Sequence, residues 1–235
     1  FLNLYKKFCP GPISFVLKLK KKTLISKNVT NNKKTLAVRF PKHPLTRKLL
    51  SKLKYPIAAP SANISTRISP VKKKDVIDEF GKKIKFVLDG GQSKIGVEST
   101  IITLIKKPQI LRLGGLEKEE INKFLKINTK YLKKPKNILV PGQGNLHYSP
   151  KIPIRLNVKN PRQYEAFVLI NKRKLSGKNY FYLTKNENLK EAAKNLYSVL
   201  RKIKKNKFKS IAIEKIPNKG LGETINDRLI RASKF

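Results

Sequence analysis

Hydrophobic and polar positions alternate along the first half of the chain with two different periods. Apolar residues occupy every second position over residues 13–19, and a shorter stretch of this kind covers residues 35–39, which is the period of a strand. Over residues 44–53 the leucines recur at helical spacing behind Pro44, as in a helix that opens with proline. Strand and helix therefore alternate, which predicts an α/β fold.

The same alternation continues to about residue 127. Ser69 and Pro70 are placed as the cap and first position of a helix that extends to Phe80. An apolar face also marks a helix over residues 116–125. Strands, the last two joined as a hairpin, are predicted for residues 86–88, 99–105 and 109–112.

A stretch rich in Lys, Asn and Pro separates this half from a second α/β region. The hydrophobic pattern that follows this stretch predicts a small Rossmann-like domain with right-handed parallel crossovers. The predicted organisation is a first domain of residues 1–127, a linker of residues 128–152 and a second domain of residues 153–235. In the second domain, strands are predicted for residues 166–170, 180–183 and 210–213, and helices for residues 187–204 and 224–233.

Positive charge dominates the composition. Lys and Arg number 55 against 14 Asp and Glu, for a net charge of +41 at pH 7, which favours a nucleic acid or an acidic membrane surface as partner. The lysines are spread over every segment, however, and only 8% of the residues are aromatic, whereas a stacking platform for bases needs interleaved aromatics. Two interpretations stay open: a solvated lysine surface without a partner, and a basic module that binds double-stranded RNA or tRNA.

Composition also excludes several protein classes. With 39% hydrophobic residues the chain can build folded cores, and it has no apolar stretch near the roughly 20 residues of a membrane-spanning helix. A single cysteine, Cys9, and two histidines make up no familiar zinc site, so we expect no bound metal and a reducing, cytoplasmic setting. The sequence contains no Met, which predicts that Phe1 is internal to a longer protein.

Polar loops at strand ends hold the candidate chemistry. No paired carboxylates and no Ser/His/Asp order occur at suggestive spacing, so no catalytic residue is predicted. Hydroxyls, amides and Gly-flanked backbone beside Arg39 and Arg112 are suited to hold phosphates and carboxylates. They favour an anion site, although ordinary turns use the same residue types. The polar groups are Ser61, Asn63, Ser65 and Ser69, residues 89–91, and Glu98-Ser99-Thr100.

The order of these segments is more specific than any one of them. They are Phe8-Cys-Pro-Gly-Pro12, Val38-Arg-Phe-Pro41, Pro56-Ile-Ala-Ala-Pro-Ser-Ala-Asn63, Leu88-Asp-Gly-Gly91, Gly96-Val-Glu-Ser-Thr-Ile-Ile102 and Ile110-Leu-Arg112. Later come His147-Tyr-Ser-Pro150, Gly220-Leu-Gly222, Asn226-Asp-Arg-Leu229 and Arg231-Ala232. Together, and over nearly the whole chain, they resemble the long, two-domain form of the threonylcarbamoyl-AMP synthase family, which combines a YrdC-like domain with a C-terminal domain.

The resemblance implies both a fold and a reaction. The fold is an open, twisted mixed sheet with helices, followed by the smaller α/β domain. The enzyme implied is a nucleotidyltransferase that joins L-threonine, bicarbonate and ATP into threonylcarbamoyl-AMP and releases pyrophosphate. ATP enters as its Mg²⁺ complex, no cofactor is tightly bound, and the product passes to the tRNA threonylcarbamoyl transferase machinery. Because such an enzyme mainly aligns and neutralises two anions, it needs no general base.

The resemblance also implies roles for individual residues. Those implied to bind L-threonine are Arg39, Ala59 and Ser99. Those implied to bind ATP are Thr35, Ser61, Asn63, Ser69, Arg112 and Tyr148, the last as a lid from the linker. Structural alternatives stay open for three of them: Arg39 as a surface ion-pair residue, Ser99 as a strand cap, and Tyr148 as an aromatic packed on a domain.

The sequence departs from the family pattern in a few places. Cys9, Thr66 and Leu113 stand where the family usually has Trp, Gly and Pro. The family's first segment, with a Lys-x-Arg motif that grips ATP and substrate, is expected to precede Phe1. We therefore expect these 235 residues alone to be inactive.

Overall fold

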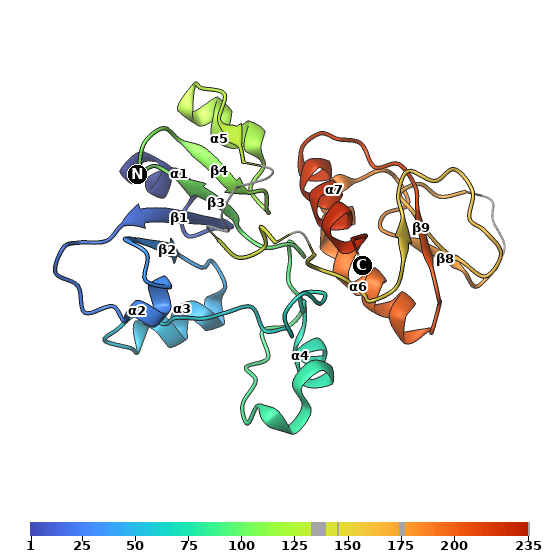
Figure 1. The fold of residues 1–235 in the computed structure, drawn as a ribbon, viewed down its shortest axis with the longest axis horizontal. Helices are drawn as coiled ribbons and strands as arrows, with labels where there is room; N and C mark the ends of the chain where they lie inside the picture. Colours follow the sequence, from blue (N-terminus) through green and yellow to red (C-terminus); the bar gives the residue numbers. More distant parts are fainter. Residues whose placement is uncertain (133–139, 145, 174–176, 235) are drawn as a thin grey trace. The chain divides into compact units, whose positions relative to one another are not determined.

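A computed structural model describes residues 1–132, 140–144, 146–173 and 177–234. The chain forms two compact units (Figure 1). The first unit comprises Phe1–Pro60 and Glu98–Gln143, and the second comprises Ser61–Val97 and Gly144–Phe235. The segment Ser61–Val97 thus packs with the C-terminal part of the chain. The domain boundaries placed at residues 127 and 152 follow a different criterion, the sequence pattern, and stay a prediction.

The first unit is built on a five-stranded mixed sheet in the order β2-β1-β3-β4-β5. Strand β1 runs antiparallel to β2 and parallel to β3, while β3 and β4 are antiparallel and β5 lies parallel to β4. The strands are β1 (Ile13–Lys18), β2 (Thr35–Arg39), β3 (Thr100–Thr103), β4 (Gln109–Arg112) and β5 (Lys130–Tyr131).

Side chains of β1 alternate between two buried layers, as a strand inside a sheet requires. Ile13 and Phe15 are fully buried on one face, in a core that also contains Ile110 and Ile121. Val16 faces the other way and packs in a separate small cluster. The helices of this unit are α1 (Leu2–Phe8), α2 (Lys27–Thr30), α3 (Pro44–Ser51) and α5 (Lys118–Leu125).

The structure confirms the strands predicted for the first unit and the hairpin between the last two of them. It also confirms the helices that open at Pro44 and cover residues 116–125, with slightly shorter bounds. Three elements, α1, α2 and β5, are absent from the sequence prediction. They contain seven, four and two residues, which is too short for a hydrophobic period to be recognised.

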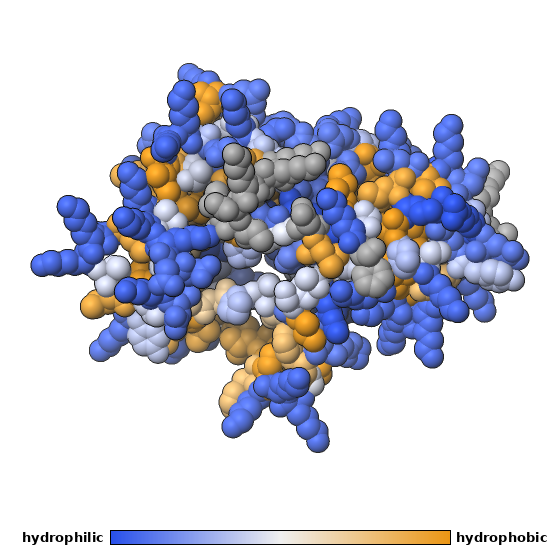
Figure 2. Space-filling model, viewed as in Figure 1, coloured by the Kyte–Doolittle hydropathy of each residue, from blue (hydrophilic) through white to orange (hydrophobic). Residues whose placement is uncertain are grey.

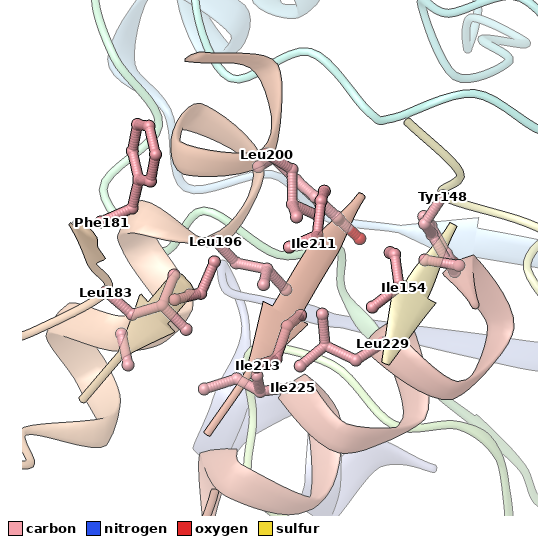
Figure 3. Packing of buried hydrophobic residues seen from close by; sticks show 14 of the residues in the cluster. Tyr148, Ile154, Phe181, Leu183, Leu196, Leu200, Ile211, Ile213, Ile225 and Leu229 are labelled. Carbon is pink, nitrogen blue, oxygen red and sulfur yellow. The ribbon is translucent and has the colours of Figure 1, made fainter. Parts of the chain in front are cut away.

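The second unit contains a four-stranded parallel sheet in the order β6-β9-β7-β8. Its buried core joins this sheet to the two long C-terminal helices (Figure 3). The parallel topology and the predicted strands and helices of the second domain are confirmed, and β6 is an addition within the unit. The elements are α4 (Lys73–Phe80), η1 (Gly81–Lys83), β6 (Ile154–Arg155), β7 (Ala166–Leu169), β8 (Tyr180–Tyr182), α6 (Leu189–Lys205), β9 (Ile211–Ile213) and α7 (Leu221–Ala232).

Helix α4 begins three residues later than the sequence predicts. Ser69 and Pro70 are not its cap and first position, because the cap residue is Lys72, with an extended backbone. The carboxylate of Asp75 accepts a hydrogen bond from the backbone N–H of Val71 at 2.9 Å. This bond gives the backbone N–H of buried Val71, just before the cap residue, a hydrogen-bond partner.

The strand predicted for residues 86–88 is wrong. These residues belong to no strand of the described structure, and Phe86 and Leu88 are 88% and 62% exposed. The apolar run gives the segment a local preference for extended backbone. A strand also needs a neighbour for its backbone hydrogen bonds, and that requirement cannot be read from the run itself.

Hydrophilic side chains make up much of the surface on the face that Figure 2 shows. Apolar areas lie between these hydrophilic side chains. This distribution favours the interpretation of a solvated lysine surface. Among the described residues, no helix combines the length and the apolar character needed to cross a membrane.

Candidate functional site

One end of the first sheet gathers the ends of four strands. Strands β1 and β3 are parallel and both begin there, whereas β2 and β4 run in the opposite direction and end there. Residues at these strand ends therefore lie side by side. Three residues singled out by the sequence, Arg39, Ser99 and Arg112, occupy this end of the sheet.

The pairing register places the functional groups in one row across the strands. Arg39 lies opposite Ser14. Ser14 lies opposite Ile101, which in turn lies opposite Arg112, and opposed residues project from the same face of a sheet. The Oγ atoms of Ser14 and Ser99 are 2.7 Å apart, and both serines are buried. Ser99 is thereby fixed against β1.

Arg112 is buried, and its hydrogen bonds end on neutral oxygen atoms. Its Nη2 and Nε atoms donate to the Ser99 carbonyl oxygen at 2.8 and 3.2 Å, and Nη2 also lies 3.2 Å from Ser99 Oγ. Its Nη1 atom donates to the Pro141 carbonyl oxygen at 3.2 Å. Because a buried cation without a counterion is costly, this arrangement is suited to receive an anion.

The guanidinium of Arg39 makes no side-chain hydrogen bond or ion pair with the residues that the structure describes. The residue is solvent-exposed as a whole, yet partial desolvation of its guanidinium lowers its pKa. Repulsion from Arg112 lowers the pKa further, while Glu98 acts in the opposite direction. Arg39 nevertheless keeps its proton. Two like charges that repel one another at this end of the sheet favour the binding of a negatively charged group.

Gly114 allows the chain after β4 to pass against the backbone that leads into β3. A Cβ atom on Gly114 would lie 2.3 Å from the Thr100 backbone nitrogen and 2.5 Å from the Glu98 carbonyl oxygen. The N–H of Gly115 donates to that carbonyl at 2.8 Å, and Thr100 Oγ1 donates to the Leu116 carbonyl at 2.5 Å. The residues at the start of β3 are therefore held by the chain after β4 as well as by β1.

In the second unit, the polar loop of residues 61–69 is ordered by its own side chains. The Nδ2 atom of buried Asn63 donates to the carbonyl oxygens of Ile64 and Arg67 at 2.9 and 3.1 Å. The Oδ1 atom of Asn63 is also buried and has no hydrogen-bond partner among the described residues. Ser69 is buried, whereas Ser61 is exposed. The loop thus combines a fixed backbone with polar groups suited to a ligand.

Tyr148 is buried in the core of the second unit, with 1% of its surface exposed (Figure 3). Its ring stacks on Tyr197 at a centroid distance of 5.8 Å and an interplanar angle of 19°. The guanidinium carbon of Arg228 lies 4.8 Å from the centroid of the same ring. The interpretation of Tyr148 as an aromatic packed on a domain describes this geometry, and its contact with a nucleotide stays a prediction.

Two other predicted site residues stand apart from the row of strand ends. Thr35 begins β2 opposite Lys18, so it lies about 13 Å along the strand from Arg39 at the usual rise per residue. Ala59 is exposed and belongs to no helix or strand. The sheet therefore brings Arg39, Ser99 and Arg112 together but not these two, whose roles stay predictions.

Comparison with known proteins gives matches over nearly the whole chain. Residues 1–114 match the family described as telomere recombination (Sua5, YciO and YrdC), and residues 116–234 match the C-terminal domain of threonylcarbamoyl-AMP synthase. The threonylcarbamoyl-AMP synthase of Pyrococcus abyssi is 36% identical over 99% of this chain and 73% of its own length. The chain belongs to the threonylcarbamoyl-AMP synthase family. The corresponding Bacillus subtilis protein is 32% identical over 98% of this chain and 72% of its own length.

Solved structures of the family share the fold. The crystal structure of P. abyssi Sua5 complexed with L-threonine is similar with a TM-score of 0.86 and 33% identity, over 98% of this chain and 72% of that chain. A P. abyssi Sua5 variant with a His and the adjacent Tyr changed to Ala gives a TM-score of 0.85, with 32% identity over 99% of this chain and 72% of that chain. These similarities confirm the family, the fold class and the enzyme class predicted from the motifs.

Membership of the threonylcarbamoyl-AMP synthase family gives one departure a structural meaning. Thr66, for which the resemblance implies Gly, has a φ of 68°. This left-handed conformation costs little for glycine but is unfavourable for a β-branched residue. The loop therefore keeps the backbone shape that glycine supports, with Thr in its place.

Ser14 is the site residue that the sequence analysis does not single out. Its hydroxyl is the partner of Ser99 Oγ, yet in the sequence it is one polar residue inside an apolar run. The sequence could indicate Ser14 only by its place on the same face of β1 as Val16, where apolar residues are otherwise expected. Among the described residues, no group of three or more His, Cys, Asp or Glu is placed to hold a metal ion.

Proposed function

We propose that this protein joins L-threonine, bicarbonate and ATP into threonylcarbamoyl-AMP and releases pyrophosphate. Family membership supports the activity, and the L-threonine complex of P. abyssi Sua5 supports the amino-acid substrate. The structure supports an anion-binding role for the end of the first sheet. The observation that carries the proposal is the pair Arg39 and Arg112, which repel one another and flank the Ser99 segment.

The reaction can be written in two balanced steps. The threonine amine and bicarbonate first form a carbamate and release water. A carbamate oxygen then attacks the α-phosphorus of ATP, the bond to the bridging oxygen breaks, and pyrophosphate leaves. The nucleophile carries its own negative charge, so the protein has to align two anions and neutralise them rather than remove a proton.

The residues divide between the two substrates. Arg39 binds the threonine carboxylate with its two-pronged guanidinium, and Ser99 and Ala59 fix the rest of the amino acid. Arg112 counters phosphate charge from its buried position. In the second unit, the polar loop binds the nucleotide, and Asn63 offers its buried Oδ1 as an acceptor. The ATP-binding residues proposed are Thr35, Ser61, Asn63, Ser69, Arg112 and Tyr148.

Mg²⁺ enters with ATP as part of the substrate and needs no protein ligand set in this proposal. It would neutralise phosphate charge while the arginines orient the reacting groups. The threonylcarbamoyl-AMP formed is a mixed anhydride and therefore an activated acyl donor. We propose that it is passed to the machinery that transfers the threonylcarbamoyl group to tRNA in the cytoplasm.

The test is substrate-dependent pyrophosphate release by the complete gene product. We expect pyrophosphate and threonylcarbamoyl-AMP to form only when ATP, L-threonine and bicarbonate are all present. Arg39→Ala should abolish most of the activity at low threonine, whereas Arg47→Ala, an exposed arginine on α3, should leave it unchanged. Absence of the adenylate from the complete gene product would contradict the proposal.

A tRNA-binding measurement on the same protein distinguishes a synthase from a basic RNA-binding module. Such a module would bind tRNA with a steep dependence on salt, because phosphate contacts release counterions. If tRNA binds tightly while ATP is not turned over, the binding module is the correct interpretation. Turnover of ATP with threonine and bicarbonate, without added RNA, favours the synthase.

A further inference from the structure

Helix α7 carries a buried cluster of charged side chains that the proposed chemistry does not use. Arg228, Arg231 and Asp227 are 1%, 7% and 8% exposed. Nη1 of Arg228 lies 2.6 Å from Asp227 Oδ2, and Nη2 of Arg231 lies 3.2 Å from Asp227 Oδ1. One carboxylate thus serves two cations. Buried ion pairs are often no more stabilising than apolar side chains of similar size. Stability alone therefore does not explain why the two arginines are buried here.

Each arginine contacts a residue in the part of the chain that precedes the second sheet, Gly144 for Arg231 and Tyr148 for Arg228. Nη1 of Arg231 donates to the Gly144 carbonyl oxygen at 2.7 Å. The Arg228 guanidinium lies 4.8 Å from the centroid of the Tyr148 ring, within the range of a cation–π interaction. Tyr148 itself has a φ of 63°, a conformation that a non-glycine residue keeps only when its surroundings hold it.

This part of the chain is in turn bonded to the polar loop of residues 61–69. The backbone N–H of Ser149 donates to the Thr66 carbonyl oxygen at 2.8 Å, and the backbones of Ser149 and Arg67 form an isolated parallel β-bridge. Helix α6 secures the end of this loop, because Nη2 of Arg201 donates to the Ile68 carbonyl oxygen at 2.5 Å. A continuous series of contacts within the second unit therefore leads from α7 to the loop that carries the proposed nucleotide-binding residues.

We propose that Arg228 and Arg231 are positioning residues for ATP binding. They fix Gly144 and Tyr148 and, through the neighbouring Ser149, set the conformation of the loop of residues 61–69. The inference deepens the proposed function, on which its kinetic consequence rests. The residues proposed to bind threonine, Arg39 and Ser99, belong to the first unit, so the effect should be specific to ATP.

The kinetic test compares Michaelis constants in the complete gene product. Arg228→Ala and Arg231→Ala should each raise the KM for ATP about tenfold and change the KM for threonine less than about twofold. Arg173→Ala removes an arginine that pairs with Glu214 in the same unit and should change neither constant. A purely structural defect would lower the amount of active enzyme and leave both constants unchanged.

A double-mutant cycle tests whether Arg228 acts through the Tyr148 ring. If it does, Arg228→Ala should have little further effect on the KM for ATP once Tyr148→Ala is present. Arg228→Lys keeps a cation and should restore part of the ATP affinity. Additive effects of the two alanine variants would show that Arg228 does not act through Tyr148 and would overturn this step.

Hydrogen exchange tests the positioning without any turnover. The Ser149 amide, which is bonded to Thr66, should exchange faster in Arg228→Ala and Arg231→Ala, while amides of β7 should keep their wild-type rates. Unchanged exchange at Ser149 together with an unchanged KM for ATP would overturn the proposal. If the wild-type complete gene product forms no adenylate, the proposed function fails, and faster exchange at Ser149 would still show that α7 holds this segment.

Discussion

The hydroxyl of Ser14 on β1 meets the hydroxyl of Ser99 at a distance of 2.7 Å. On its other side, Ser99 receives hydrogen bonds from Arg112 on both its carbonyl oxygen and its Oγ. A residue expected to fix the substrate amino acid is thus itself fixed by two neighbouring strands. This support makes Ser14 a residue that acts through Ser99.

Ser14→Ala should weaken threonine binding without unfolding the protein. The loss of one buried hydroxyl partner costs about 1 to 3 kcal/mol, so we expect the KM for threonine to rise about 5- to 150-fold while the KM for ATP changes less. Steady-state kinetics in the complete gene product measure both constants. Ser51→Ala, on the exposed end of α3, is the matched control. Equal effects of the two variants would show that the Ser14 contact has no role.

Arg39→Lys tests whether the shape of the guanidinium matters as well as its charge. Lysine keeps the positive charge but cannot make two parallel hydrogen bonds to a carboxylate. We expect the threonine Kd to rise about tenfold for Arg39→Lys and about 100-fold for Arg39→Ala. Titration calorimetry with L-threonine measures it, with Arg47→Ala as control. A wild-type Kd in Arg39→Lys would mean that charge alone is recognised.

Thr66→Gly should stabilise the protein. At a φ of 68°, a non-glycine residue costs about 1 to 2 kcal/mol, part of which glycine loses again through its more flexible unfolded chain. The net gain in unfolding free energy should be about 0.5 to 1 kcal/mol. Denaturant unfolding measures it. Thr66→Ala keeps the β-carbon and should give little of this gain, so a gain of equal size in that variant would contradict the explanation.

Protonation of Glu165 in acid should make the second unit less stable. The hydrogen bond from Arg155 holds the Glu165 pKa below the ordinary value, outweighing desolvation, and the Arg162 backbone N–H acts in the same direction as Arg155. The ionised carboxylate therefore stabilises the fold above the ordinary glutamate pKa, and this contribution is lost as the pH falls through the lowered value.

The comparison of wild type with Glu165→Gln checks this sign. The difference in unfolding free energy should be largest at about pH 7 and should shrink towards about pH 3. Glu120→Gln, an exposed carboxylate on α5, provides the baseline. A difference that grows as the pH falls would show that the direction assigned to the Glu165 pKa is wrong.

Sequence patterns predict the sheets well because their strands carry clear periods. Alternation over residues 13–19 predicts β1, and the apolar runs of the second domain predict the parallel strands β7 to β9. The strand predicted for residues 86–88 fails for a physical reason. Periodicity reports a local preference, whereas strand formation also requires a partner whose position is set by the whole fold.

The candidate site is predictable only in part. The arginines and serines are visible in the motifs, but Ser14 is not, because a cross-strand contact depends on register. Tyr148 shows a second limit. The lid role that the family resemblance implies for it stays a prediction, whereas the structure shows the neighbours of its buried ring, Tyr197 and Arg228. Nothing in the linker sequence alone reveals these partners on α6 and α7.

Following the fate of ATP in the complete gene product tests the proposed function most directly. Labelled ATP should be converted to threonylcarbamoyl-AMP and pyrophosphate only when both L-threonine and bicarbonate are supplied, and Arg112→Ala should reduce this conversion at least about 100-fold. Formation of no adenylate under these conditions, or formation that is indifferent to threonine, would contradict the proposed function.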